Sequence, residues 1–250
     1  MRSQFTKRLG FLASLLSAGL IIGSTANADI LLFDFGNDDS NRGASVPSPD
    51  GNGNYWNSIR AGLFFTDLDD IAGNTTTVDF GFTTAGGTDY FNGPSGAVED
   101  PSATVYDALA LGNLGVDEAV YDWYNSSTFQ IQQLDPNQTY DLTFFGSRKY
   151  PLDDTVTRYT AYTDATFTTP IAFVDLTIGD GLADHNQDQV AVLTGLTPQG
   201  PNHVLYIGYA GASGGTGYLN ALQVATTVPE PATLTLLLAG SLALLKRRRN

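Results

Sequence analysis

The 250-residue sequence contains no cysteine, one methionine, two tryptophans and two histidines. The absence of cysteine excludes disulfides, thiolate nucleophiles and zinc–thiolate sites. With only His185 and His203 available, a metal site of several histidines is difficult to build. Charged residues make up 15% of the chain, below the roughly 25% of an ordinary soluble protein.

Basic residues are also scarce, and most of them lie at the two ends of the chain. Between Asp29 and Val228 there are five basic and 25 acidic residues, so this body carries a net charge of −20. Such a surface repels phosphate backbones, which excludes direct nucleic-acid binding. Aromatic residues make up 11% of the chain and can form a core, which disfavours disorder.

Residues 1–28 have the pattern of a secretory signal peptide. A positively charged start precedes an apolar run at 9–23, and Ala26 and Ala28 provide the small residues of a cleavage site. The alternative is a membrane anchor, but the apolar run is shorter than the roughly 20 residues that span a bilayer. We expect signal peptidase to cleave after Ala28, so that the exported chain begins at Asp29.

The C-terminal end, residues 228–250, has three parts. They are a rigid motif (Val228, Pro229, Glu230, Pro231), an apolar run at 232–245, and a basic group (Lys246, Arg247, Arg248, Arg249). As a helix, the apolar run covers about 21 Å at 1.5 Å per residue, less than the roughly 30 Å of a hydrocarbon core. The basic group is expected to stay on the cytoplasmic side, with the body across the membrane.

This tail resembles the PEP-CTERM sorting signal, and residues 228–231 match its motif residue by residue. The resemblance implies export in a Gram-negative bacterium and transient insertion into the inner membrane. It further implies removal of the tail by an exosortase-type transpeptidase and delivery to the cell surface or an exopolysaccharide (biofilm) matrix. The alternative is an ordinary transmembrane anchor. In either case the tail concerns sorting and leaves the activity of the body open.

Residues 29–227 are expected to form one all-β domain. Apolar or alternating runs separated by turn residues predict strands at 30–35, 59–65, 76–82, 128–134, 139–147, 158–163, 171–178, 189–196, 203–210 and 218–225. A turn at 135–138 predicts a hairpin of 128–134 with 139–147. Short helices are expected at 103–111 and 116–123. About ten such strands predict an antiparallel, jelly-roll-like β-sandwich.

Three parts of the body resemble the galactose-binding-like and malectin-like jelly rolls. They are the opening segment 30–36 with 56–59, the central strand 140–145 and the closing segment 217–224. The resemblance implies a jelly-roll fold and, loosely, carbohydrate binding, because these folds serve many functions.

Two pairs of aromatic residues are candidate sugar contacts: Tyr55 with Trp56, and Trp123 with Tyr124. Flat rings beside Asn and Asp side chains suit sugars, whose C–H faces stack while their hydroxyls accept and donate hydrogen bonds. The alternative is packing in the core or under a loop, where large aromatics often lie.

Acidic loop clusters are candidate calcium sites because carboxylate and amide oxygens suit Ca²⁺. The candidates are Asp50, Asn52 and Asn54 in one loop, and Asp180, Asp184 and Asp188 in another. The first loop does not match an EF-hand, since Tyr55 stands where that loop requires glycine. The alternative is a solvated acidic surface that keeps the protein soluble. No other cofactor is predicted.

The sequence Gly211-Ala212-Ser213-Gly214-Gly215 fits the G-x-S-x-G pattern of a nucleophile elbow. That elbow requires a helix after the serine, whereas 218–225 is a predicted strand, so we expect a glycine-rich turn instead. Only three glutamates occur, and no carboxylate pair for glycoside hydrolysis can be identified. No catalytic residue is therefore predicted.

Together these observations predict an exported, non-enzymatic module that binds carbohydrate or mediates adhesion at the cell surface. One alternative is a purely structural matrix component without a discrete ligand. Another is a polysaccharide-modifying hydrolase. Exposure of Trp56 and Trp123 on one face would favour binding, and burial of both would favour the structural alternative.

Overall fold

The structure is a computed structural model that describes residues 29–36, 45–59, 63–83, 89–91, 106–148, 154–179 and 185–227. All of these belong to one compact unit. Three sets of residues singled out in the sequence lie outside the described part. They are the signal peptide with Ala26 and Ala28, the candidate ligands Asp180 and Asp184, and the sorting signal with Val228, Pro229, Glu230, Pro231, Arg247, Arg248 and Arg249. The corresponding interpretations stay predictions.

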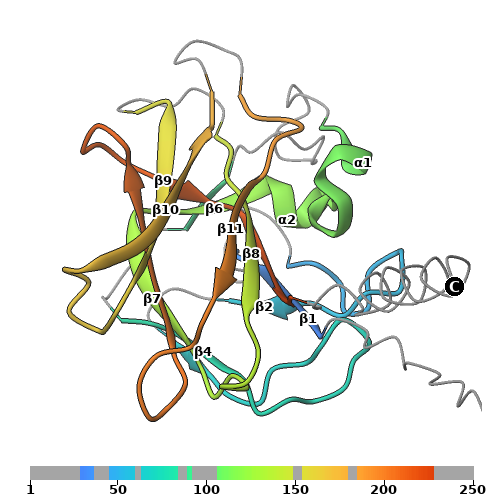
Figure 1. Ribbon diagram of the computed structural model, residues 1–250. Coiled ribbons are helices and arrows are strands. Elements are labelled where there is room, and N and C mark those ends of the chain that lie inside the picture. Colours follow the sequence, from blue (N-terminus) through green and yellow to red (C-terminus); the bar gives the residue numbers. More distant parts are fainter. Residues whose placement is uncertain are drawn as a thin grey trace, which may run out of the picture. The chain divides into compact units, whose positions relative to one another are not determined.

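Strands dominate the described residues, and most pairs are antiparallel, which confirms the predicted all-β fold (Figure 1). A five-stranded sheet has the order β11 (Ala191–Leu196), β8 (Tyr140–Phe145), β14 (Ala221–Thr226), β1 (Ile30–Asp34) and β2 (Asn57–Ser58). The β1–β2 pair is parallel.

A six-stranded sheet carries the candidate site described below. Its order is β10 (Pro170–Thr177), β9 (Val156–Tyr162), β12 (Leu205–Gly211), β7 (Ser127–Gln132), β4 (Asp79–Phe82) and β3 (Phe64–Phe65). A small third sheet comprises β13 (Tyr218–Leu219), β6 (Asp122–Asn125) and β5 (Asp89–Phe91).

The main hydrophobic core contains side chains of both large sheets. The ring of Phe144 on β8 stacks on that of Tyr159 on β9, with centroids 4.3 Å apart and planes 11° apart. The Tyr159 hydroxyl donates a hydrogen bond of 2.6 Å to the backbone oxygen of Tyr218. This hydrogen bond joins the six-stranded sheet to the small one, and side chains of all three sheets belong to the same core.

Three short helical segments lie on the side of the five-stranded sheet, whereas β7 and β9 lie across from them (Figure 1). They are α1 (Ala108–Leu111), η1 (Gly112–Leu114) and α2 (Asp117–Tyr121). Asp107 begins α1 by accepting hydrogen bonds from two backbone N–H groups. A second cluster packs Leu32 and Phe145 of the sheet against Leu111 and Val120 of the helices.

The burial patterns of the strands follow from these layers. In β1, Leu31 and Phe33 face the main core and Leu32 faces the helical side, so a continuous apolar run is buried on both faces. By contrast, buried and less buried residues alternate along β7. That alternation shows that the six-stranded sheet has one core face and one outer face.

The predicted hairpin of 128–134 with 139–147 is wrong. The turn exists, because Gln138 N donates to Asp135 O at 3.2 Å. However, β7 pairs with β12 and β4, whereas β8 pairs with β11 and β14 in the other sheet. The chain crosses between sheets here, with Leu134 buried in the main core, so the turn signal was local and could not report which strands pair.

Other boundaries also differ from the sequence prediction. The predicted strand 59–65 is observed only at Phe64–Phe65, and residues 60–62 are outside the described part. The helix predicted at 116–123 is observed at Asp117–Tyr121, and β6 begins at the next residue, Asp122. No helix within the described residues is long and apolar enough to cross a bilayer.

Candidate functional site

The outer face of the six-stranded sheet is hollowed over the middle of one row of side chains. Backbone register aligns the row at right angles to the strands: Phe173, Thr160, Gly208, Thr128 and Thr83. Neighbouring strands lie about 4.8 Å apart, so the row is about 19 Å long. Its middle members are two threonines and a glycine, which rise little above the backbone.

A cavity of about 220 Å³ lies over the middle of this row, and we call it the trough. Its wall and floor include Thr128, Arg158, Thr160, Tyr162, Gly208 and Ala210. Arg158, Thr160 and Tyr162 are alternate residues of β9 and therefore point to one face of the sheet. The trough is thus built on three regular strands rather than on loops.

Tyr162 forms an aromatic wall of the trough. A Cβ atom placed on Gly208 would lie 3.1 Å from Cε2 of this ring, so the ring extends along the glycine backbone. Phe167 supports the ring edge-on, with centroids 5.5 Å apart, and contacts Tyr206 at 6.0 Å. Phe167 has a φ of 52°, a conformation that is costly for a bulky residue, and these ring contacts compensate for it.

Hydrogen-bonding groups surround the aromatic wall. Thr128 and Thr160 place hydroxyls on the floor, and a hydroxyl both donates and accepts. Gln130 is opposite Tyr206 in the neighbouring row, and Gln132 follows on the same face of β7. Gln132 also lines a polar cavity of about 440 Å³ with Gln133, Asn202 and other residues. Amide groups therefore continue from the trough toward that cavity.

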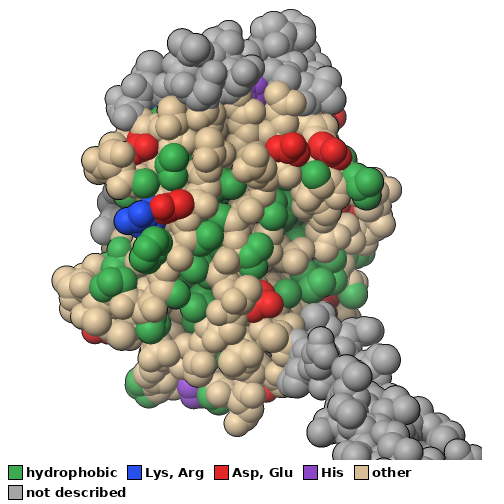
Figure 2. All heavy atoms as spheres, turned by 45° about the horizontal axis from the view of Figure 1, so that its top comes forward, with side chains coloured by type: hydrophobic (Ala, Val, Ile, Leu, Met, Phe, Trp, Pro, Cys, Tyr) green, Lys and Arg blue, Asp and Glu red, His purple; other side chains and the backbone are tan. Residues whose placement is uncertain are grey.

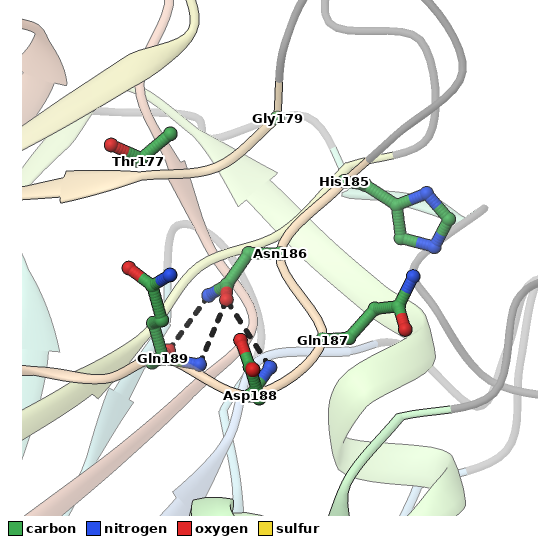
Figure 3. Close-up of a pocket in the computed structure, with 7 residues that line it drawn as sticks. All are labelled: Thr177, Gly179, His185, Asn186, Gln187, Asp188 and Gln189. Atoms are coloured by element: carbon green, nitrogen blue, oxygen red, sulfur yellow. Dashed lines mark hydrogen bonds between the residues drawn. The ribbon is translucent and has the colours of Figure 1, made fainter.

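A third cavity, of about 420 Å³, lies at the loop that follows β10 (Figure 3). Buried Asn186 holds this loop: its Nδ2 donates to the backbone oxygens of Gly146 and Gln189, and its Oδ1 accepts from the Gln189 N–H. Asn186 therefore has a structural role. Residues 180–184, which begin the loop, are outside the described part.

The second calcium prediction concerns this loop. Asp188 is exposed at the rim of the cavity, while Asp180 and Asp184 are not described. Across the described residues, no three Asp, Glu, His or Cys side chains are grouped as a metal ion would require. A calcium site at 180–188 stays a prediction.

In the first predicted calcium loop, the carboxylate of Asp50 accepts hydrogen bonds from the chain itself. Its Oδ1 accepts from the N–H groups of Asn52 (2.8 Å) and Asn54 (2.9 Å). Its Oδ2 accepts from Trp56 Nε1 at 3.0 Å. Asp50 is buried, and its oxygens close a turn, so the Asp-Asn pattern has a structural explanation that needs no metal.

The segment 70–74 repeats this turn. Asp70 Oδ1 accepts from the N–H groups of Ala72 and Asn74, and Gly73 has a φ of 81°, like Gly53 at 88° in the first loop. Tyr55 packs on the second loop, because a Cβ at Gly73 would lie 2.8 Å from its ring. Tyr55 is thus half-buried between two turns.

These turns predict acid-sensitive stability. Burial raises the pKa of Asp50, but hydrogen bonds from Trp56, Asn54 and Asn52 outweigh it, and the pKa falls below the ordinary 3.8. A lowered folded-state pKa stabilises the protein above the ordinary value, and this stability is lost as the pH falls through the folded value. The melting temperature should be nearly constant from about pH 7 to 5 and fall below pH 3.8.

The matched variant is Asp50→Asn, which cannot titrate. Near neutral pH its melting temperature should be lower than that of the wild type. On acidification its melting temperature should fall by less than that of the wild type. A wild-type melting temperature that stayed constant to about pH 2 would contradict this account.

Three of the four predicted sugar-contact residues are buried. Trp56 is 5% exposed and packs with Leu32 and Val46 on the helical side of the five-stranded sheet. Its backbone N–H also donates to Ser48 Oγ at 2.9 Å. A sugar can stack only on an accessible ring face, so the predicted contact role of Trp56 is corrected to core packing.

The same correction applies to Trp123 and Tyr124, which are 2% and 1% exposed. The Trp123 ring contacts Tyr218 edge-on, with centroids 4.8 Å apart, and the Arg148 guanidinium lies 5.0 Å above it. Tyr124 packs edge-on against Phe35 and Phe82. Both residues belong to β6, which the sequence did not predict, and the strand carries them into the core.

The G-x-S-x-G segment is a turn between strands, as expected. Gly211 N donates to Gly215 O at 2.8 Å, and the next elements are β13 and β14. Ser213 N donates to Asp154 Oδ2 at 2.7 Å. The segment therefore lacks the helix that a nucleophile elbow requires.

Sequence reasoning missed the trough entirely. A signal was present in 156–162, where Arg158, Thr160 and Tyr162 alternate with core residues and place a cation, a hydroxyl and a ring on one face. The partner residue Gly208 could not be found in this way, since its role depends on the register of β12 with β9.

Comparisons with protein-family models, with curated proteins and with solved structures found no match to this chain. Function must therefore be inferred from its own residues.

Proposed function

We propose that this protein is an exported, non-enzymatic carbohydrate-binding or adhesion module with a jelly-roll-like β-sandwich body. It acts at the cell surface or in an exopolysaccharide matrix, after signal peptidase and an exosortase-type transpeptidase have processed its ends. Its binding site is the trough. The observation that carries the proposal is the position of the Tyr162 ring beside a row of threonines and Gly208 on an outer sheet face.

The chemistry of the trough suits a sugar chain. The Tyr162 ring offers an apolar surface with a polar tip. The Thr128 hydroxyl bonds that of Thr83 at 2.7 Å and keeps a lone pair to which a sugar hydroxyl can donate. Thr160, which is 8% exposed, adds a second hydroxyl to the floor. The small residues Thr160, Gly208 and Thr128 lie side by side on three adjacent strands, so a polymer that follows them lies across the strands.

Loss of the Tyr162 ring is expected to weaken polysaccharide binding at least about tenfold, which corresponds to about 1.4 kcal/mol. The test compares wild type, Tyr162→Ala and Tyr162→Phe by affinity electrophoresis and calorimetry against a panel of polysaccharides. The full chain is used in detergent, because both ends carry apolar runs. Tyr162→Phe keeps the ring and should bind nearly as the wild type does.

Tyr55→Ala serves as a control, because Tyr55 lies in the paired turns and not in the six-stranded sheet. It should leave affinity unchanged. Equal losses in Tyr55→Ala and Tyr162→Ala would show that the trough is not the site.

A second candidate, a structural matrix component without a ligand, is favoured by the burial of both tryptophans. It predicts that no polysaccharide of the panel is retained by the wild type. The hydrolase alternative needs two acidic side chains facing each other across a cleft. Among the described lining residues of the three cavities, only Asp188 is acidic, so none of these linings supports it.

A further inference from the structure

The only basic side chain at the described wall of the trough is Arg158, and its charge is already matched. Asp175 of β10 is opposite Arg158 in the register. The guanidinium donates from Nε to Asp175 Oδ1 at 2.7 Å and from Nη2 to Oδ2 at 2.8 Å. This is the two-bonded geometry that fits a carboxylate to a guanidinium.

The guanidinium is also held from a second side. Its Cζ lies 4.3 Å from the ring centroid of Phe173, which belongs to the row that the trough follows. Arg158 and Asp175 are 41% and 39% exposed, and ion pairs so exposed add little to stability. The main consequence of the pair is therefore the charge that the trough presents, which is close to zero.

The body that carries the trough is acidic as a whole. The body carries a net charge of −20. The other basic residue in the described part is Arg148, whose Nη1 donates to the Tyr218 hydroxyl beside Trp123, away from the trough. On the face shown in Figure 2, blue occurs only beside red, among apolar and neutral side chains. The net charge of the body would repel an anionic polymer, and among the described residues that line the trough no unmatched cation offsets this repulsion.

We propose that the trough selects neutral polysaccharides over anionic ones, and that the Arg158–Asp175 pair determines this specificity. The inference rests on the proposed function, since it names the ligand class of the same site. Asp175 acts by occupying the guanidinium that a uronate carboxylate would otherwise bind.

The test uses the full chain in detergent and polymers that differ only in charge. The probes are alginate, pectate, and the neutral polymer obtained by carboxyl reduction of each, together with neutral dextran, cellulose and galactomannan. Wild type should retain at least one neutral polymer and bind each acidic polymer at least about tenfold more weakly than its reduced form.

The decisive variant is Asp175→Asn, which frees the charge of Arg158. It should bind the acidic polymers about tenfold more tightly than wild type at low salt, and the gain should disappear near 1 M salt, where the screening length is about 3 Å. Asp164→Asn is the control, because it also removes one exposed carboxylate but one that bonds Thr166 and not an arginine. It should not produce the gain.

The outcomes separate the two proposals. If wild type binds acidic and reduced polymers equally, charge selection is wrong while the trough remains a binding site. If Asp175→Asn and Asp164→Asn behave alike, the pair does not determine specificity. If wild type retains no polymer at all, the proposed function fails, and charge selection fails with it.

Discussion

Replacing Trp56 by alanine is expected to lower the free energy of unfolding by about 3–5 kcal/mol. The ring packs with Leu32 and Phe145 of the five-stranded sheet and with Val46. Its removal leaves a cavity among these side chains. The indole N–H also donates to Asp50, and the carboxylate would lose that donor. Urea unfolding of wild type and variant measures the difference.

Trp56→Phe is a smaller change at the same position. It keeps a six-membered ring in the core but loses the hydrogen bond to Asp50 and part of the packing, so a cost of about 2 kcal/mol, smaller than that of Trp56→Ala, is expected. If Trp56→Ala cost less than about 1 kcal/mol and instead abolished polysaccharide binding, the original interpretation of Trp56 as a sugar contact would be right and the present one wrong.

The second large effect is expected for Gly146→Ala. An added Cβ would lie 2.6 Å from the Tyr218 carbonyl oxygen and closer still to the Tyr159 hydroxyl. These two atoms form the 2.6 Å hydrogen bond that joins the sheets, so the methyl group must displace it. Overpacking and a lost buried hydrogen bond together predict a loss of about 3 kcal/mol or more of unfolding free energy.

Gly51→Ala is the matched control, because no atom lies within 4 Å of the position that its Cβ would take. It should change stability by less than about 0.5 kcal/mol. In the Gly146→Ala background, Tyr159→Phe removes one of the two clashing oxygens and should recover part of the loss. Equal effects of Gly146→Ala and Gly51→Ala in denaturant unfolding would contradict the packing described for this contact.

The general β architecture could be predicted from the sequence because its signals are local. The run at 30–33 is apolar without interruption since β1 is covered on both faces, and 127–132 alternates since β7 is covered on one. Strand pairing could not be predicted in this way. The turn at 135–138 is compatible with a hairpin or with a crossing between sheets, and only the distant strands β12 and β14 decide between them.

The candidate site was misplaced for a related reason. Trp56 and Trp123 have side chains that suit either a sugar or a core, and the sequence does not report which face of a strand they occupy. Asp50, Asn52 and Asn54 have oxygens that suit either calcium or turn closure. In the structure Asp50 closes a turn, and calcium binding by this loop stays a prediction. The trough depends on Gly208 and Thr160 meeting across two strands distant in sequence.

The central claim is that polysaccharide binds on the outer face of the six-stranded sheet. Its most direct test is amide NMR of the labelled protein during titration with a polymer that it retains. The account predicts that the shifts of Thr128, Thr160, Tyr162 and Gly208 move at the lowest polymer concentrations, while those of Trp56 and Trp123 stay in place. Shifts confined to the loops around Trp56 or Trp123, with β9 and β12 unaffected, would contradict it.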